Sequence, residues 1–463
     1  MFDGHFPDLW KRSFITPIYK SNNRENIRNY RPISKLNIIP KLFEAIITEK
    51  LTSQLKNVII NEQHGFRNNR STTTNLLTFQ QFTLEKLEAN TQVDVVYADF
   101  SKAFDSVNHN FILQKLYHIG VHGAFLKWIE GYLKNRIQNV KYKAFTSRDI
   151  RVTSGVPQGS HLGPLLFLLF INDVKSSLLP VNFLLFADDL KLYFSIKSID
   201  DCETLQRNLN GLSTWCNSNK LPLNIDKCKV LRYHRSRKPI TYDYSLDGHV
   251  LESVTKFKDL GVIFDPKLKF VDHVQYISSK ANRVLGFVRR MTSDFSNIQT
   301  LKTYFTLVRP SLLYASPIWS PFYQVHIKKL ETIQHKFLNY VAWKIGLPSP
   351  WLSHDYKQVA AIINISSLSS HRNLNDLTFF FDLLNSVIDC EALLAKINIS
   401  VPSRDLSCTN QLSFTPSSAK TNLYFFSPLN RMTRIANNTS IEMTLSRNQF
   451  IRQARERLLK DFN

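Results

Sequence analysis

The chain has 463 residues, 43% of them hydrophobic, and a formal net charge of +22 at pH 7. Its length predicts about three structural units, and its six Trp and 33 Phe exclude wholesale disorder. The excess of Lys and Arg favours a polyanionic partner, either nucleic acid or an anionic membrane surface. The sequence argues against a membrane, because its longest apolar run, Leu165 to Ile171, is far shorter than the roughly 20 residues of a spanning helix.

The N-terminus and the cysteines predict an intracellular protein that is not secreted. The residues after Met1 lack the charged and then apolar pattern of a signal peptide. Arg235 to Lys238 is too short a basic run for a convincing nuclear signal and favours a turn between strands, so nucleus and cytoplasm both stay open. The cysteines are odd in number and never form Cys-x-x-Cys, which favours buried thiols over disulfides or a zinc site: Cys202, Cys216, Cys228, Cys390 and Cys408.

The N-terminal part is basic and rich in loops. Lys20 and Arg31 each lie beside extended, proline-marked backbone, which presents a side chain rather than packing it. Taken alone, each could equally be an ordinary surface cation. Helical spacing of apolar residues predicts a core-facing helix from Pro40 to Lys56, and Ser71-Thr72 is expected to cap a second helix that ends near Leu87.

Two predicted strands end in carboxylates. Leu184 to Tyr193 is typical of two strands that meet at an acidic turn, Asp188-Asp189. Successive side chains on extended backbone point to opposite faces, so one of these acids is expected to be the main ligand. Asp-Asp could simply close a hairpin, but Val93 to Ala98 predicts another strand, which leads into Asp99. Two strand-borne carboxylates in so basic a chain indicate a metal site that acts on phosphates.

Further strands, helices and turns are predicted around these acids. The loop from Ser154 to Ser160 has two glycines close to Pro157-Gln158, which let backbone approach a ligand. The remaining segments are expected to be helices at 111–116, 128–133 and 202–216, an apolar helix after Gly163-Pro164, strands at 150–153, 221–224 and 227–233, and a turn-strand unit at 257–264.

Beyond Asp265-Pro266 the pattern becomes helical. A helical wheel of residues 274–288 has one apolar face, with Lys280, Arg283 and Arg290 roughly opposite. That basic face could follow a phosphate backbone or could simply be solvated. Residues 346–350 are typical of a domain boundary, and they precede a Ser/Thr-rich loop at 403–421 and a basic helix at 450–459.

Six blocks, in order and spacing, resemble those of the reverse transcriptases of non-LTR retrotransposons, in particular jockey-like and related insect-type elements. The resemblance covers about Gly4 to Ile345. The blocks are Pro17-Ile18-Tyr19-Lys20, Asn29-Tyr30-Arg31-Pro32-Ile33, Gln63-His64-Gly65-Phe66-Arg67, Ala98-Asp99-Phe100-Ser101-Lys102-Ala103-Phe104-Asp105, Ser154-Gly155-Val156-Pro157-Gln158-Gly159-Ser160 and Phe186-Ala187-Asp188-Asp189.

The resemblance implies an α+β, right-hand polymerase fold in which the palm carries an antiparallel sheet and the thumb is helical. The implied divisions are fingers at 1–90, a catalytic palm at 91–265, a helical thumb at 266–345 and a helical C-terminal segment of unknown role at 346–463. Family members usually carry an endonuclease domain before the polymerase, so we expect a truncated copy or fragment of a longer protein.

The resemblance also implies the metal ligands. Asp99 and Asp188 would hold two Mg²⁺ ions, or Mn²⁺ in their place, with Asp189 as a third acid and the Phe100 carbonyl as a further ligand. This agrees with the chemistry of nucleotidyl transfer, in which one metal activates the primer 3′-hydroxyl and another neutralises the leaving pyrophosphate. Mg²⁺ prefers carboxylate and phosphate oxygens, so His and Cys ligands are not expected.

By the same resemblance, six residues bind the incoming nucleotide, and Phe100 is one of them. Lys20 and Arg31 would hold the triphosphate, for which a guanidinium fork is well shaped. Phe104 would act as a steric gate against the sugar 2′-hydroxyl, although it could also be a packing residue. Gln158 and Gly159 would form the floor of the site that binds the nucleotide and the template base.

The resemblance also implies roles for residues near pyrophosphate, primer and template. Lys227 would donate a proton to pyrophosphate, with a surface lysine as the alternative. Gly261 belongs to the primer-grip turn, where Asp259 replaces the usual aromatic residue and leaves the primer contacts open. Arg67 is expected to lie along the template strand, where binding would be electrostatic.

The implied function is an RNA-directed DNA polymerase, a nucleotidyltransferase that extends a primer 3′-hydroxyl with deoxynucleoside triphosphates on an RNA template. The expected partners are template RNA and DNA primer or target DNA, and no protein partner is inferable. The alternative is an inactive relic that only binds nucleic acid. A group II intron maturase or a telomerase-like polymerase shares the acids but fits the other blocks less well.

Overall fold

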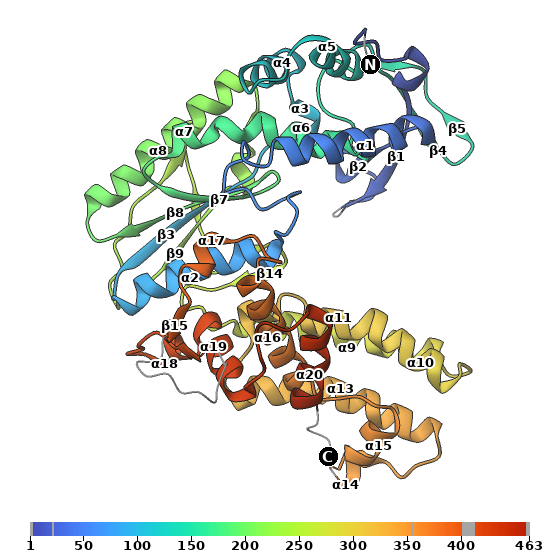
Figure 1. Cartoon of the computed structure of the whole chain (residues 1–463), viewed down its shortest axis with the longest axis vertical. Coiled ribbons are helices and arrows are strands. Elements are labelled where there is room, and N and C mark those ends of the chain that lie inside the picture. The colour runs from blue at the N-terminus through green and yellow to red at the C-terminus, as the bar shows by residue number, and fades with distance from the viewer. Residues whose placement is uncertain (1–2, 21–22, 354, 401–412, 460–463) are drawn as a thin grey trace. The chain divides into compact units, whose positions relative to one another are not determined.

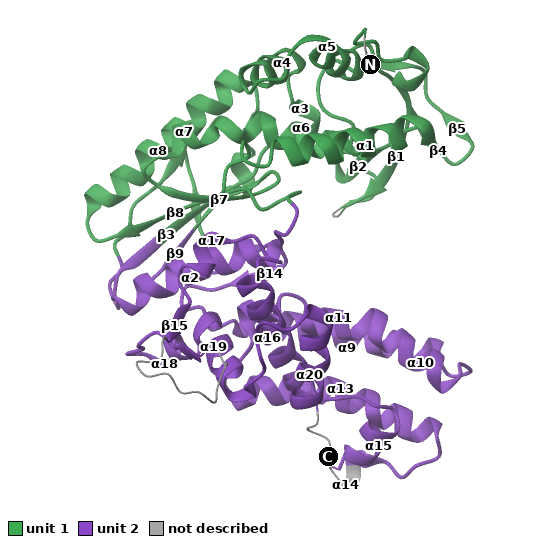
Figure 2. Ribbon diagram, viewed as in Figure 1, with its two compact units in different colours: residues 1–67, 94–230, 240–253 green, residues 68–93, 231–239, 254–463 purple. Residues whose placement is uncertain are grey.

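The computed structural model describes residues 3–20, 23–353, 355–400 and 413–459. Cys408 and residues 403–412 of the predicted polar loop lie outside them. The chain divides into two compact units (Figure 2): a first unit of residues 1–67, 94–230 and 240–253, and a second of residues 68–93, 231–239 and 254–463. Each unit therefore assembles segments that are far apart in the sequence.

The central sheet has the strand order β12-β9-β3-β8-β7 (Figure 1). Strands β7 and β8 form an antiparallel hairpin, whereas the edge strand β12 runs parallel to β9 because the chain returns through the β10-β11 hairpin. The predicted antiparallel sheet thus has one parallel edge. Its strands and the small hairpin are β3 (Gln92–Ala98), β7 (Asn182–Phe186), β8 (Asp189–Ile196), β9 (Lys229–Tyr233), β10 (Ser245–Leu246), β11 (His249–Val250) and β12 (Glu252–Ser253).

A second sheet in the first unit is built around the N-terminal strand. Its order is β2-β1-β4-β5, with β6 also paired to β4. The β1-β2 hairpin pairs Ile18 with Arg31, which fixes the position of that cation along the strand. The strands are β1 (Arg12–Tyr19), β2 (Tyr30–Lys35), β4 (Ile137–Tyr142), β5 (Phe145–Thr146) and β6 (Ile150–Arg151).

The helices of the first unit surround one buried, wholly apolar helix. Helix α6 (Leu162–Ile171) has nine buried residues and packs against α1 and α4. Burial on all sides explains why its sequence shows no polar face. The other helices are α1 (Ile38–Gln54), α3 (Ala103–Ser106), α4 (His109–His118), α5 (Gly123–Leu133), α7 (Lys175–Leu178), α8 (Ile199–Asn219) and the 3₁₀ turns η1 (Asp8–Lys11), η2 (Ile27–Asn29), η3 (Asn172–Val174) and η4 (Ile225–Lys227).

The second unit is mainly helical and includes α2, which comes early in the sequence. Ser71 caps α2 in a reciprocal hydrogen-bonded capping box with Thr74, as the sequence predicted for this helix start. Its elements are α2 (Thr72–Glu88), β13 (Phe257–Asp259), β14 (Val262–Phe264), α9 (Val271–Met291), α10 (Asn297–Thr303), the π-helical turn η5 (Tyr304–Val308), α11 (Arg309–Leu313), α12 (Ser316–Trp319), α13 (Gln324–Lys344), α14 (Pro350–Ser353), α15 (Lys357–Ile362), α16 (Leu368–Leu384), α17 (Glu391–Leu394), β15 (Asn398–Ser400), β16 (Ser413–Thr415), α18 (Asn422–Phe425), α19 (Pro428–Thr439) and α20 (Arg447–Leu458).

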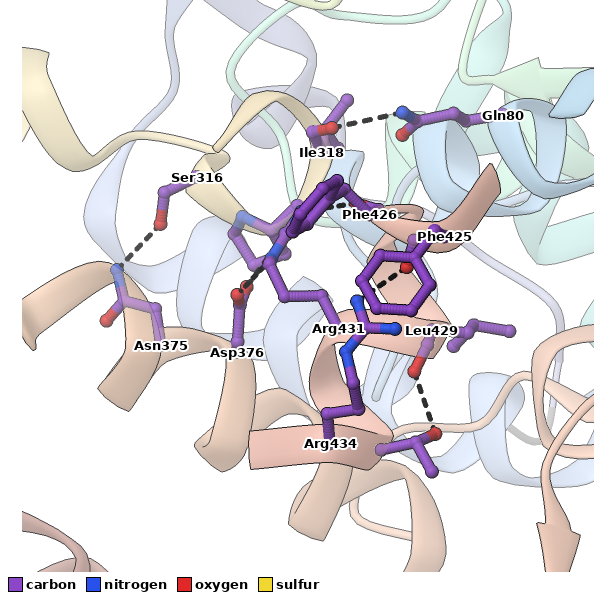
Figure 3. A network of polar contacts seen from close by, with 12 residues as sticks. Gln80, Ser316, Ile318, Asn375, Asp376, Phe425, Phe426, Leu429, Arg431 and Arg434 are labelled. Atoms are coloured by element: carbon purple, nitrogen blue, oxygen red, sulfur yellow. Dashed lines mark hydrogen bonds and ion pairs between the residues drawn. The ribbon is translucent and has the colours of Figure 1, made fainter. Parts of the chain in front are cut away.

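A buried ion pair joins the helices of the second unit (Figure 3). The Asp376 carboxylate on α16 is fully buried and accepts from Arg431 Nε on α19 at 2.6 Å. The same guanidinium also donates to the Pro317 carbonyl at 2.8 Å, and Gln80 Nε2 on α2 donates to the Ile318 carbonyl at 3.0 Å. These contacts attach α2, α12, α16 and α19 to one another, so residues after 345 form part of the core of this unit.

Most of the predicted elements are present, with two differences near the acids. Residues 221–224 contribute only an isolated bridge at Leu223, and the strand predicted from Lys227 begins at Lys229 after the η4 turn. The predicted apolar face of α9 is buried, and so are the thiols of Cys202, Cys216, Cys228 and Cys390. The division of the units does not change at residues 346–350, and the four-part division into fingers, palm, thumb and C-terminal segment stays a prediction.

Candidate active site

The acidic turn is a two-residue connection between β7 and β8. Phe186 pairs with Asp189, which leaves Ala187 and Asp188 as the two central residues. Ala187 has a positive φ of 59°, a conformation that hairpin turns require and that usually favours glycine. The turn holds Asp188 half-buried and leaves Asp189, the first residue of β8, exposed. The two neighbouring acids thus lie in different environments.

Asp99 follows the fully buried strand β3 and pairs with a residue from a distant loop. Ser101 N–H donates to Pro222 O at 2.8 Å, and Asn224 N–H donates to Asp99 O at 2.7 Å. These two bonds flank Phe100, so its carbonyl faces away from residues 222–224. The η4 turn that follows brings Lys227 Nζ to 2.9 Å from Asp99 Oδ2.

The electrostatics of Asp188 bring four predicted site residues together. Burial raises the pKa of Asp188, and the nearby Asp99 carboxylate raises it further. Lys20 and Arg31 act in the opposite direction and lower the pKa of Asp188. Both cations are exposed. The Asp99 carboxylate and the two exposed cations therefore lie within electrostatic reach of the Asp188 carboxylate.

Aromatic packing fixes the Phe104 ring in the first unit. The ring stacks on Phe167 with centroids 4.5 Å apart and meets the edge of Phe66 at 6.1 Å. Contacts of this kind on two sides restrict the ring to one orientation. Phe104 therefore provides a rigid apolar surface.

The predicted nucleotide-binding loop is tied to the same segment. Gln158 Nε2 donates to Asp105 Oδ1 at 2.8 Å, and the Gln158 carbonyl accepts from Ser34 N–H at 2.7 Å. At Gly155, which has φ of 87°, an added Cβ would lie 2.7 Å from the Asp105 carbonyl oxygen. Gly159 is exposed, with φ of 115°. The two glycines allow close approach to the backbone of Asp105 and Ser34, and the predicted approach to a ligand stays a prediction.

Gln63 is a site residue that sequence reasoning missed. Its side chain is 1% exposed and binds the acidic turn. Gln63 Oε1 accepts from Ala187 N–H at 3.0 Å and from Gly65 N–H at 2.8 Å, while Nε2 donates to Ala187 O at 3.3 Å. An added Cβ at Gly65 would lie 2.3 Å from Ala187 N. The Gln-His-Gly block was visible in the sequence, but nothing in it indicated contact with a turn 124 residues away.

Two predicted nucleic-acid contacts have local structural roles in the described residues. Arg67 Nη1 donates to Ile60 O at 2.8 Å, so part of its guanidinium bonds to its own loop. Leu260 and Gly261 have φ of 43° and 92° and form the tight turn between β13 and β14. Tyr314 OH donates to the Leu260 carbonyl at 2.9 Å and holds this turn. Their contacts with template or primer stay predictions.

The acids can contribute to a metal site but do not complete one. Within residues 3–20, 23–353, 355–400 and 413–459, no three His, Cys, Asp or Glu side chains are grouped so as to hold a metal ion. Asp99 Oδ2 nevertheless forms an ion pair with the Lys227 ammonium group. Because Mg²⁺ takes much of its coordination from water and substrate phosphate, two carboxylates suit it chemically.

The chain belongs to the reverse transcriptase family. The family model described as "Reverse transcriptase (RNA-dependent DNA polymerase)" matches residues 18–264, and the mixed helices and sheets are those of the right-hand polymerase fold that the sequence predicted. Enzymes of this family use divalent metal ions. Across the described residues, every helix is too short or too polar to cross a lipid bilayer.

The similar curated proteins are polymerases of non-LTR retrotransposons, which confirms the resemblance. The "Probable RNA-directed DNA polymerase from transposon BS" of Drosophila melanogaster is 27% identical over 72% of this chain and 38% of its own length. The "RNA-directed DNA polymerase from mobile element jockey" of the same species is 25% identical over 75% of this chain and 39% of its own length. The chain thus spans about two fifths of the length of these relatives.

Among solved structures, two telomerases align with this chain. Apo telomerase from Candida tropicalis has a TM-score of 0.42 and 10% identity, covering 84% of this chain and 63% of its own. Telomerase from Candida albicans, in complex with a TWJ fragment of telomeric RNA, has a TM-score of 0.38 and 12% identity, covering 83% of this chain and 66% of its own.

Proposed function

We propose that this chain is an RNA-directed DNA polymerase that extends a primer 3′-hydroxyl with deoxynucleoside triphosphates on an RNA template. One observation carries the proposal: Asp188 interacts electrostatically with Asp99, Lys20 and Arg31. The two carboxylates can bind metal ions. The side chains of Lys20 and Arg31 can bind the phosphates on which those metal ions act. Family membership supplies the reaction type.

We propose that Asp99, Asp188 and Asp189, with the Phe100 carbonyl, hold two Mg²⁺ ions, which Mn²⁺ can replace. When bound, such ions activate the attacking hydroxyl and neutralise the leaving pyrophosphate. The orientation of the Phe100 carbonyl away from residues 222–224 supports its inclusion. Lys227, paired with Asp99 at 2.9 Å, is proposed as the proton donor to pyrophosphate once the substrate phosphates compete with Asp99 for its ammonium group.

The remaining residues are assigned to the nucleotide and the strands. Lys20 and Arg31 would bind the triphosphate and Phe104 would exclude a 2′-hydroxyl, for which its fixed ring gives support. Gln158 and Gly159 would form the floor of the nucleotide site. Template RNA would pass Arg67, and the DNA primer or target DNA would meet Gly261. Residues 1–90, 91–265 and 266–345 are proposed as fingers, palm and thumb.

Primer extension tests this function. The purified chain is given poly(rA), oligo(dT) and either dTTP or UTP, with EDTA as the blank. We expect dTTP incorporation that EDTA abolishes, because the divalent ions are required. In Asp188→Asn, incorporation should be lost while RNA binding stays nearly intact. Full activity of this variant would refute the proposal, and salt-sensitive binding without any incorporation would indicate a nucleic-acid-binding relic.

A second variant tests the sugar gate. Phe104→Val removes the ring and should raise UTP incorporation relative to dTTP by at least about tenfold, because a shape-selective pocket loses its discrimination when space opens. Phe104→Tyr keeps the ring and serves as the matched control, with selectivity close to that of the original chain. The measurement is the ratio of kcat/KM for the two nucleotides, and an unchanged ratio in Phe104→Val would assign the ring to packing alone.

A further inference from the structure

A cavity of about 700 Å³ lies at the C-terminal ends of α9 and α13, in the second unit. It shares no residue with the acidic site. Its lining combines cationic, aromatic and small polar side chains, of which the argument uses Arg289, Arg290, Asn339, Tyr340, Trp343 and Ser349.

The two helices run side by side in the same direction (Figure 1). Lys336 Nζ on α13 donates to Asn282 Oδ1 on α9 at 3.3 Å, and one or two turns later Tyr340 OH donates to Arg289 O at 3.2 Å. At the end, Lys344 Nζ donates to the carbonyls of Thr292 and Phe295, both at 2.6 Å. The Lys344 ammonium therefore offsets the partial negative charge at the C-terminus of α9, and phosphate can approach this end.

The aromatic side chains form a preorganised stacking surface. The Tyr340 and Trp343 rings are stacked, with centroids 5.9 Å apart and an interplanar angle of 20°. Tyr340 is held by the bond to Arg289 O and by a 3.1 Å contact with Thr292 Oγ1. Trp343 is 69% exposed. A large indole that packing leaves so exposed offers an open π-face to a ligand.

The charge around the cavity has one sign. Arg289 and Arg290 are both exposed, and the Arg289 guanidinium lies 5.5 Å from the centre of the Tyr340 ring. Among the residues that the structure describes, no Asp or Glu lines the cavity, and the nearest acid in sequence, Asp294, follows Ser293 without contributing to the lining. The surface is therefore complementary to an anion that carries an aromatic group.

We propose that this cavity binds an unpaired nucleotide of single-stranded nucleic acid, with its base stacked on Trp343 and its phosphates on Arg289 and Arg290. Aromatic side chains beside guanidinium groups are the usual means of holding single strands. A paired duplex offers no free base face to Trp343, which favours a single strand. Asn339 and Ser349, which hydrogen bond to each other at 2.6 Å, give polar groups at the rim. The site is independent of the proposed polymerase activity.

Photo-cross-linking and binding test this proposal without nucleotide or metal, so an inactive polymerase centre does not affect the result. The full chain is mixed with a short oligo(rA) that contains one 5-iodouridine, and the cross-linked residue is identified by mass spectrometry. We expect cross-links at Trp343 or Tyr340. Cross-links found only on the first unit would overturn the proposal.

Matched variants separate stacking from charge. Trp343→Ala should weaken oligo(rA) binding at least about fivefold, as expected for loss of base stacking, and should leave an abasic oligonucleotide of equal charge unaffected. Phe287→Ala removes another exposed aromatic side chain of α9 outside the cavity and should change neither. Equal losses in the two variants would refute the stacking site.

The double variant Arg289→Gln/Arg290→Gln should weaken the binding of both oligonucleotides. It should also reduce the slope of log binding constant against log salt concentration by about 1.4, the value for two lost contacts to single-stranded phosphates. Lys280→Gln/Arg283→Gln removes the same charge from α9 outside the cavity and should have a smaller effect. Equal effects of the two double variants would show that only general charge matters. Comparing oligo(rA) with oligo(dA) shows whether the site prefers RNA or DNA. If poly-glutamate displaced the bound oligonucleotide as effectively as oligo(rA) does, the cavity would be a site for an acidic peptide, and the proposal would be overturned.

Discussion

Gln63 holds the acidic turn through two hydrogen bonds to the Ala187 backbone, while a third, from Gly65 N–H, ties the side chain to its own loop. Gln63→Leu keeps the size of the side chain but leaves the buried N–H and carbonyl of Ala187 without this partner, at a cost of about 1–3 kcal/mol. We expect Asp188 to lose its fixed position, so that kcat falls by at least about tenfold while KM for dTTP changes little.

A matched variant separates positioning from stability. Gln80 is equally buried, at 3% exposed, and its amide bonds to a carbonyl in the second unit. Gln80→Leu should therefore lower the unfolding temperature to a similar degree without the loss in kcat. Direct Mn²⁺ binding, measured by electron paramagnetic resonance, should weaken only in Gln63→Leu. If both variants lose activity in proportion to stability, Gln63 has a merely structural role.

His273 makes the second unit sensitive to acid. It is 1% exposed, and its Nδ1 accepts from Ile263 N–H at 3.2 Å, which requires an unprotonated nitrogen. Burial, with a smaller effect of Lys258, lowers the pKa of His273 from 6.5 to about 4. Because the folded pKa is lowered, stability is fully present above pH 6.5 and falls as the pH drops towards 4, by up to about 3 kcal/mol. Urea unfolding from pH 7 to pH 4 measures this loss, and His273→Asn should show a smaller pH dependence.

At the scale of helices, the ion pair between Asp376 on α16 and Arg431 on α19 is sensitive to mutation, because its carboxylate is fully buried. Asp376→Ala leaves the Arg431 guanidinium without its charge partner and should destabilise the second unit by roughly 3–5 kcal/mol. Glu456→Ala breaks an exposed pair on α20 and should cause no measurable change. Urea denaturation compares them, and equal stability of the two variants would contradict the role assigned to Asp376.

The sequence predicted the helices and the acidic strands better than the contacts between distant segments. Apolar periodicity identified α1 and α9, and the carboxylates after two predicted strands indicated that Asp99 and Asp188 belong to one site. The strand predicted from Lys227 begins two residues later, at Lys229, because residues 225–227 fold into a turn that directs the Lys227 side chain to Asp99. Gln63 escaped notice because an uncharged amide at the end of a loop carries no periodic or charge pattern.

Considered as a whole, the molecule is expected to owe its proposed general affinity for nucleic acid to its charge of +22. Binding of primer–template should therefore fall by about a thousandfold or more between about 50 and about 200 mM salt, as for proteins that contact several phosphates. Fluorescence anisotropy across this range measures the slope. Binding that is insensitive to salt would mean that the basic residues are not at the interface.

The membership of α2 in the second unit bears on how the chain folds as it leaves the ribosome. Glu85 on this helix pairs with Lys396, and Glu88 accepts from the Thr421 hydroxyl at 2.6 Å. An early helix thus has partners that are translated more than three hundred residues later. Until they emerge, the buried face of α2 must stay solvated or be shielded by a chaperone. A ribosome that stalls between these segments would therefore release a chain with an exposed apolar helix, prone to aggregation.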